Sequence, residues 1–229
     1  MNAPIDFERA RFNMIEQQIR PWDVLDLQVL ELLSLVRRED FVPLAHKALA
    51  FTDMQIPLLQ PTDEALQHGH CMLEPKVEAR ILQDLQLRPH EKVLEVGAGS
   101  GYMAALLASR AQRVISLEMH PDLVRMARAN LQRAGLSNVE VREADGARGL
   151  PGEAPFDVIV LSGSVAEVPA PMLAQLKVGG RLSAVVGFEP VMRATFITRT
   201  GQTTYTTAQP WDTVAPRLAN FPEPSRFRF

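Results

Sequence analysis

The 229-residue sequence contains a single cysteine, Cys71, and no apolar run approaching the roughly 18 residues that a membrane-spanning helix needs. One thiol cannot form a disulfide within the chain, which favours a reducing compartment. The first residues, MNAPIDFERARF, carry charges where a secretory signal peptide has its apolar segment. We therefore expect a cytoplasmic protein without a membrane segment.

An excess of charge of one sign is also missing. Lys and Arg together number 24 and Asp and Glu 27, which gives a formal net charge of −3. Proteins that bind nucleic acid through its phosphates usually present a strongly basic surface, so no nucleic-acid partner is expected. The hydrophobic content of 46% is enough for the core of one α/β domain with an appendage.

The segment KVLEVGAGSGY, residues 92–102, is the clearest signal in the chain. Its apolar start predicts a buried strand, and Gly97, Gly99 and Gly101 predict a turn into a helix. Glycine in such a turn lets a ligand approach main-chain N–H groups. The spacing G-x-G-x-G differs from the dinucleotide fingerprint G-x-G-x-x-G, and Glu95 before the turn suits an amino group better than a phosphate.

Two further predicted strands end in acidic residues. Residues 114–117 form an apolar strand that ends at Glu118, about 20 residues beyond the glycines, where a carboxylate can accept both hydroxyls of a ribose. Residues 139–141 predict a third strand that leads to Asp145 and Gly146, a suitable place for a polar side chain beside an adenine. The three strand ends together predict a site for an adenosine cofactor.

Strand and helix patterns alternate through most of the remaining sequence. Helices are expected over residues 76–87, 103–108, 121–134 and 171–176, and strands over 156–161 and 181–186. This alternation predicts an α/β fold with a doubly wound, mostly parallel sheet. Residues 194–198 and 203–207 flank Thr200-Gly201-Gln202 and predict a hairpin that adds an antiparallel edge. The proline-rich tail from residue 210 is expected to pack irregularly on the surface.

The first 75 residues predict a helical and loop cover on this sheet. Apolar residues recur at helical spacing over 7–19 and 24–36, with Pro21 between the two segments. Residues 51–75 contain three prolines and predict an extended loop rather than a helix. We therefore divide the chain into a cover, residues 1–75, and a cofactor-binding domain with a C-terminal hairpin and tail, residues 76–229.

The series EVGAGSGY, SLE and ADG resembles the class I S-adenosylmethionine-dependent methyltransferases. The Phe41-Val42-Pro43 turn, the loop ending in Pro75 and the run Gly179-Gly180-Arg181-Leu182 look like the protein-L-isoaspartate O-methyltransferase family. This resemblance implies a Rossmann-like fold, S-adenosylmethionine as cofactor and repair-type methylation of a carboxylate on damaged aspartyl residues. It implies cofactor contacts at Glu95, Gly97, Gly99, Gly101, Glu118, Asp145 and Gly146.

The expected substrate loop departs from the family pattern G-Q-T-I-S-Q-P. This chain reads GHCMLEP over residues 69–75, so Cys71 and Leu73 stand where the family has hydroxyls. The candidates on the acceptor side are His70, Cys71 and Leu73, and we expect Leu73 to limit isoaspartyl methylation because it cannot donate a hydrogen bond. A more apolar loop leaves two alternatives open, a small-molecule acceptor such as an aromatic hydroxyl compound, or a protein that binds the cofactor without catalysis.

The individual loop residues also allow simpler interpretations. His70 either replaces a lost donor or is an exposed loop histidine, and Cys71 as a nucleophile would need a nearby base that lowers its pKa. His68, His70, Cys71 and Glu74 lack the paired spacing of a structural zinc site, so no metal is expected.

Ser162 and Ser164 follow the fourth predicted strand, in a turn that reads LSGS. They either border the cleft at the carboxyl ends of the strands or are ordinary turn serines. Enzymes that methylate exocyclic amines of bases usually carry a Pro-Pro-aromatic turn here, so nucleic-acid methylation is disfavoured. The sequence leaves the acceptor, peptide or small molecule, and the oligomeric state open.

Overall fold

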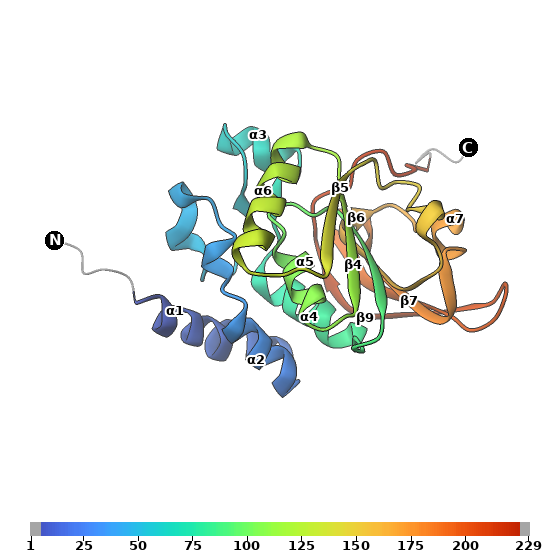
Figure 1. The fold of residues 1–229 in the computed structure, drawn as a ribbon, viewed down its shortest axis with the longest axis horizontal. Coiled ribbons are helices and arrows are strands. Elements are labelled where there is room, and N and C mark those ends of the chain that lie inside the picture. The colour runs from blue at the N-terminus through green and yellow to red at the C-terminus, as the bar shows by residue number, and fades with distance from the viewer. Residues whose placement is uncertain (1–5, 225–229) are drawn as a thin grey trace.

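The computed structural model describes residues 6–224. Within this range a seven-stranded sheet has the order β5-β4-β3-β6-β7-β8-β9, and β3 to β7 pair in parallel while β8 and β9 are antiparallel (Figure 1). The strands are β3 (Lys92–Val96), β4 (Arg113–Glu118), β5 (Val139–Glu143), β6 (Phe156–Val165), β7 (Leu176–Phe188), β8 (Val191–Arg199) and β9 (Tyr205–Thr213). The expected fold class, including the antiparallel edge, is confirmed.

Strand β3 lies at the point where the strand order reverses. The chain runs from β3 through β4 to β5 on one side and returns to β6 and β7 on the other side. Val93 and Leu94 have no exposed surface because neighbouring strands and both covering layers enclose them. In open α/β sheets, ligands bind at such a switch point, outside the carboxyl ends of the strands. The glycine turn after β3 lies there.

Three helices cover one face of the sheet and a shorter one lies on the other (Figure 1). They are α4 (Pro75–Leu85), α5 (Tyr102–Ala108) and α6 (Pro121–Arg133), opposite α7 (Ala170–Leu173). Every residue of α5 is buried because it lies between α4 and α6. Pro121 opens α6 and Gly135 follows it with a φ of 71°, as expected of a first-turn proline and a C-terminal glycine.

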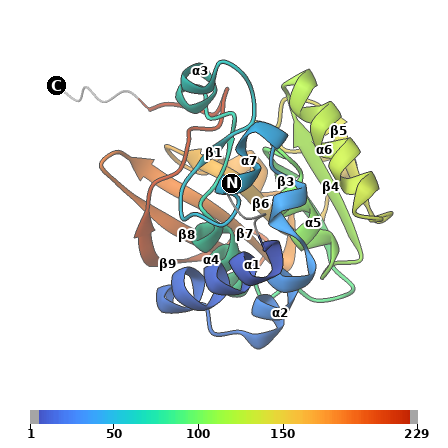
Figure 2. The ribbon, with the colours of Figure 1, turned by 90° about the vertical axis from the view of Figure 1, so that its left-hand side faces the viewer.

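The N-terminal part of the chain forms the expected helical cover (Figure 2). Its first two α-helices are α1 (Phe7–Met14) and α2 (Leu27–Leu35), joined by π-helical and 3₁₀ turns over Ile15–Ile19 and Arg20–Trp22. Asp6 and Asp26 cap the two helices by accepting main-chain N–H groups of the first turns. No helix among residues 6–224 is long and apolar enough to cross a membrane. The division at residue 75 stays a prediction.

The expectation of an extended loop over residues 51–75 is wrong in part. This segment contains α3 (Thr62–Gln67), and β1 (Ile56–Pro57) pairs with β2 (Cys71–Met72) in a small antiparallel sheet. Asp63 and Glu64 lie in the first turn of α3, where carboxylates complement the helix dipole. The prolines therefore mark the ends of short elements, and the pairing of β1 with β2 folds the substrate loop back on itself.

Two other expectations near the C-terminus need correction. The segment Leu161 to Ser164 is not a turn, because β6 continues to Val165 with a shift in register against β7 between Val160 and Ser164. The tail does not pack irregularly outside the fold. Strand β9 runs to Thr213, and residues 214–221, here termed the C-terminal strap, cross the end of β6 through a parallel bridge between Ser164 and Arg217.

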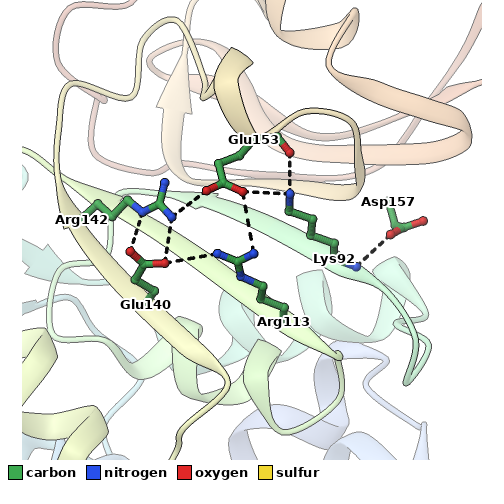
Figure 3. A network of polar contacts seen from close by, with 6 residues as sticks. All are labelled: Lys92, Arg113, Glu140, Arg142, Glu153 and Asp157. Atoms are coloured by element: carbon green, nitrogen blue, oxygen red, sulfur yellow. Dashed lines mark hydrogen bonds and ion pairs between the residues drawn. The ribbon is translucent and has the colours of Figure 1, made fainter.

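A network of charged side chains lies at the other end of the sheet, near the amino ends of β3 and β4 (Figure 3). Glu153 Oε2 lies 3.1 Å from Lys92 Nζ, and Glu153 Oε1 lies 2.8 Å from Arg142. These two partners, Arg142 first, lower the pKa of Glu153 to about 2. Exposed ion pairs contribute little to stability individually. The network therefore joins strand ends away from the switch point.

Candidate active site

The turn after β3 has the backbone that its glycines permit. Gly97, Gly99 and Gly101 have φ values of 93°, 53° and 84°, which side chains with a Cβ rarely adopt. A Cβ on Gly97 would lie 3.1 Å from Leu218 Cδ2. A Cβ on Gly101 would lie 3.2 Å from Ala127 Cα, so this glycine serves the packing of α5 against α6 and does not line the pocket.

Glu118, at the end of β4, ties this strand to the glycine turn. Its Oε2 accepts the N–H of Gly99 at 2.9 Å, and its Oε1 accepts those of Met119 and His120 at 2.9 and 3.0 Å. The residue is 8% exposed and lines the pocket. Three main-chain donors thus fix the carboxylate and leave one of its roughly four acceptor positions, on Oε2, for a further hydroxyl.

Glu95 does not line this pocket, in contrast to the direct contact expected from the sequence. It has no exposed surface, and its carboxylate accepts hydrogen bonds from Ser116 Oγ at 2.6 Å and from Ser162 Oγ at 2.8 Å. Burial raises the pKa of Glu95 to about 7, although both serines oppose this shift. Glu95 lies beneath the pocket and holds Ser162, which does line it.

The buried carboxyl of Glu95 makes stability depend on pH. The neutral form is favoured in the folded state, so its contribution is complete below the ordinary pKa of 4.5 and is lost as pH rises through about 7. We expect Glu95→Gln to raise the free energy of unfolding at pH 8 by about 3 kcal/mol and to leave it unchanged at pH 4.5. Urea unfolding at both pH values measures this.

The exposed Glu143→Gln on β5 is the matched control for the loss of one carboxylate. In this variant the free energy of unfolding should differ between pH 4.5 and pH 8 by as much as it does in the wild type. If Glu95→Gln changed the free energy of unfolding equally at pH 4.5 and pH 8, this result would contradict the raised pKa of Glu95.

Asp145 and Gly146 line the pocket on the side of β5. Asp145 Oδ1 accepts the N–H of Ala147 at 2.9 Å, and Oδ2 accepts the side-chain amide of Asn220 at 2.9 Å. A Cβ on Gly146 would lie 2.3 Å from Val96 Cγ1, so only glycine fits at this position. Asn220 belongs to the C-terminal strap, which therefore reaches across the whole pocket.

The pocket between these residues has a volume of about 100 Å³. This is well below the roughly 300 to 1,000 Å³ of typical small-molecule pockets. Leu218 of the strap lies over the glycine turn. Leu58, the residue after β1, lies 3.3 Å from the position of a Cβ on Gly99. A nucleoside-sized ligand therefore requires the strap or the loop to move outward.

The substrate loop brings two of its three candidate residues to the pocket. His70 and Cys71 line it, and the ring of His70 lies 4.8 Å from that of His120 and 5.9 Å from that of His68. Burial lowers the pKa of His70, with a further decrease from His120. His70 is accordingly a neutral side chain near pH 7, and its role toward the acceptor stays a prediction.

The surroundings of Cys71 do not suit a nucleophilic thiol. Burial raises the pKa of its thiol to about 12, with further increases from Glu74 and Glu78, and Sγ lies 3.6 Å from Gln55 Oε1. A nucleophilic cysteine needs the opposite shift. Because Cys71 is the single cysteine, we expect alkylation by iodoacetamide at pH 8 to be at least about 100-fold slower in the folded protein than in urea.

The alkylation rate should be followed by intact mass, with a free-cysteine peptide as the reference for the reagent. A folded-state rate close to that of the peptide would show an accessible, ionisable thiol and contradict the raised pKa.

Leu73 does not face the pocket, which corrects the expectation that its side chain limits the reaction directly. It is 6% exposed and packs in the core with its neighbours on α4. Its carbonyl accepts a hydrogen bond from Nη2 of the fully buried Arg38 at 2.6 Å. Leu73 therefore anchors the loop from inside, which suits an apolar side chain.

Sequence reasoning missed the residues that the strap contributes to the pocket, Arg217, Leu218, Ala219 and Phe221. The scattered apolar residues between the last prolines were a signal of burial, and Ala215 and Phe221 are in fact buried. Ser162, left open between a cleft and a turn residue, lines the pocket, whereas Ser164 pairs with the strap. No cluster of three or more His, Cys, Asp or Glu residues able to hold a metal occurs among residues 6–224.

The acceptor groups at this edge fit an S-adenosyl cofactor. Glu118 presents a fixed carboxylate where a ribose is expected, and Asp145 offers oxygens where an adenine is expected. A phosphate would meet two carboxylates here, which disfavours a dinucleotide. The assignment of individual cofactor contacts stays a prediction.

Comparisons with known proteins agree with this site. The family described as Protein-L-isoaspartate(D-aspartate) O-methyltransferase matches residues 9–213. The protein-L-isoaspartate O-methyltransferase of Methanoculleus marisnigri is 41% identical over 78% of this chain and 78% of its own length. Protein-L-isoaspartate O-methyltransferase 1 of Syntrophobacter fumaroxidans is 41% identical over 80% of this chain and 82% of its own length.

Two solved structures have the same fold. One, a protein-L-isoaspartate O-methyltransferase, matches with a TM-score of 0.73 and 24% identity over 90% of this chain and 64% of its own. The other is a putative protein-L-isoaspartate O-methyltransferase from Plasmodium falciparum in complex with S-adenosyl-L-homocysteine. It has a TM-score of 0.71 and 18% identity over 93% of this chain and 99% of its own. The resemblance inferred from the sequence is confirmed. This chain belongs to the protein-L-isoaspartate O-methyltransferase family and is an S-adenosylmethionine-dependent methyltransferase.

Proposed function

We propose that this enzyme transfers the methyl group of S-adenosylmethionine to the free carboxylate of isoaspartyl residues in peptides or proteins. The observation that carries the proposal is the family match over residues 9–213, which includes both the glycine turn and the substrate loop. The relatives at 41% identity bear the name of this activity. The changed loop residues do not oppose it, because Leu73 lies in the core and does not face the acceptor.

The reaction asks the protein mainly for positioning. S-adenosylmethionine supplies an electrophilic methyl group on its sulfonium. A carboxylate is already ionised at pH 7 and needs no general base. The chain must therefore orient two reactants and keep water out.

The residues of the pocket suit these tasks. Glu118, held by three main-chain N–H groups, orients the ribose. Leu218 of the strap and the loop at Cys71 close the pocket from above and exclude water. Glu95 and Ser162 stiffen its floor.

A peptide is the acceptor we propose, in preference to a small molecule or a nucleic acid. The family name specifies a protein residue, and a net charge of −3 does not favour a phosphate-rich partner. The cytoplasmic location inferred from the single cysteine stays a prediction.

A radiolabelled methyl-transfer assay tests the proposal. It compares one peptide in two forms, with an isoaspartyl or an ordinary aspartyl residue, and adds a small-molecule extract as a third acceptor. We expect base-labile methyl incorporation into the isoaspartyl form alone. Incorporation only into the extract would favour the small-molecule alternative, and cofactor binding without incorporation into any acceptor would favour a non-catalytic protein.

A further inference from the structure

The C-terminal strap places a guanidinium in the wall of the cofactor pocket. The strap is fixed beside β6 because Ser164 donates its N–H to Pro216 O at 2.7 Å and accepts that of Leu218 at 2.9 Å. Arg217, between these two residues, lines the pocket. Among the described residues that line it, Arg217 is the single Arg or Lys.

Arg217 is held in one orientation by groups outside the pocket. Its Nη2 donates to Gly187 O at 2.8 Å, its Nε lies 3.0 Å from Glu223 Oε1, and its guanidinium lies 5.2 Å from the ring centroid of Phe188. Two edges of the planar group are therefore occupied. A guanidinium held this way is prepared to bind a further planar anion without losing much side-chain freedom.

The remaining nitrogen of Arg217, Nη1, is buried and has no hydrogen-bond partner among residues 6–224. A buried charged N–H group without an acceptor is unfavourable, and a ligand that supplies the acceptor relieves this cost. A carboxylate is the best match, since it pairs with guanidinium through short, charge-assisted hydrogen bonds.

Two other polar side chains on this side of the pocket, those of Ser162 and Cys71, are already committed. Ser162 Oγ donates to Glu95, and Cys71 Sγ lies at hydrogen-bond distance from Gln55 Oε1. The Cys71 thiol stays neutral because burial raises its pKa to about 12. Hence no anion of the loop competes for Arg217, and no hydroxyl there is free to orient an acceptor.

We infer that Arg217 binds the carboxylate of the methyl acceptor and takes the place of the hydroxyl that the loop lacks at Cys71. The inference rests on the proposed function for the identity of the acceptor. The carboxylate oxygen forms the new bond to the methyl carbon as the bond from that carbon to sulfur breaks, and the electron pair stays on sulfur. The acceptor becomes a neutral ester, which loses its charge pairing with Arg217 and favours release.

The test uses the full chain loaded with S-adenosylhomocysteine and a peptide with one isoaspartyl residue, measured by calorimetry. We expect Arg217→Met to weaken binding of this peptide by about 10- to 100-fold, the loss of one charge-assisted contact. Binding of the corresponding methyl ester peptide should change by less than about threefold. In the methylation assay, KM should rise by the same factor as the peptide Kd and kcat should change less.

Three controls separate binding from a structural role of the strap. Arg193→Met removes an exposed arginine from the edge hairpin, where it pairs with Asp212 at 3.3 Å, and should leave all values unchanged. Arg217→Lys keeps the charge without the planar fork and should recover part of the affinity. The affinity of Arg217→Met for S-adenosylhomocysteine reports whether the pocket is intact. If the methionine variant does not fold, the change in peptide binding is measured with Arg217→Lys instead.

The outcomes distinguish the inference from the proposed function. Methylation of the isoaspartyl peptide with an unchanged KM in the folded variants would overturn the role of Arg217 and leave the function standing. Binding that depends on Arg217 without any methylation would support the inference and overturn the function. Absence of peptide binding to the loaded wild type would overturn both.

Discussion

Replacing Glu118 with alanine is expected to weaken the binding of S-adenosylhomocysteine by about one to two orders of magnitude. The carboxylate is fixed at the end of β4, and its one remaining acceptor position, on Oε2, suits a ribose hydroxyl. A hydrogen bond to a charged group contributes about 1.5 to 3 kcal/mol, so the loss of one such bond gives an effect of this size. Isothermal titration calorimetry measures it directly.

The same side chain also accepts three main-chain N–H groups, which Glu118→Ala leaves without a partner. Glu118→Gln keeps one acceptor oxygen and the side-chain volume, and should lose affinity to an intermediate degree. The unfolding free energy of both variants must be measured in parallel. Glu143→Ala, on the exposed side of β5, is the control. An unchanged affinity in a folded Glu118→Ala variant would show that the ribose binds elsewhere.

The largest effect on stability is expected from the ion pair between Arg38 and Glu78. Arg38 has no exposed surface, pairs with Glu78 of α4, and lies 5.0 Å from the ring centroid of Tyr102. Glu78→Gln would leave this guanidinium without a counter-ion in the interior. Removing one partner of a buried pair costs about 3 to 5 kcal/mol. We expect a loss of that size in urea unfolding at pH 7.

The double variant Arg38→Met with Glu78→Leu is the matched control. It removes both charges, so it should recover much of the stability that Glu78→Gln loses. It also removes the hydrogen bond from Arg38 to the Leu73 carbonyl, so the substrate loop should be less well ordered even where stability recovers. A loss below about 1 kcal/mol in Glu78→Gln, the size expected of an exposed pair, would contradict the buried pair.

The position of the substrate loop thus depends on contacts with residues distant in sequence. Arg38 belongs to the N-terminal cover, and its contacts with Leu73 and Glu78 hold the entry to α4. Apolar residues of the cover and of one face of the cofactor domain also belong to the same core cluster. Arg38 therefore affects the position of the loop without lining the pocket.

The sequence by itself determined the order of the seven strands of the large sheet along the chain and the edge at which we expect the cofactor. The strand before Gly97, the strand ending at Glu118 and the one leading to Asp145 were all predictable. Each depends on a local property, either an apolar run of strand length or glycines that permit positive φ. Parallel connection then brings the three carboxyl ends to one edge of the sheet.

Only the tertiary structure decided which side chains face the pocket. Glu95 turned out to lie beneath it and Leu73 inside the core, because strand pleat and loop packing set the direction of a side chain. The strap could not be predicted either, since its bridge joins Ser164 to Arg217 across 53 positions of sequence. No local pattern encodes such a contact. It forms because β9 returns the chain to the end of β6, where unpaired main-chain groups need partners.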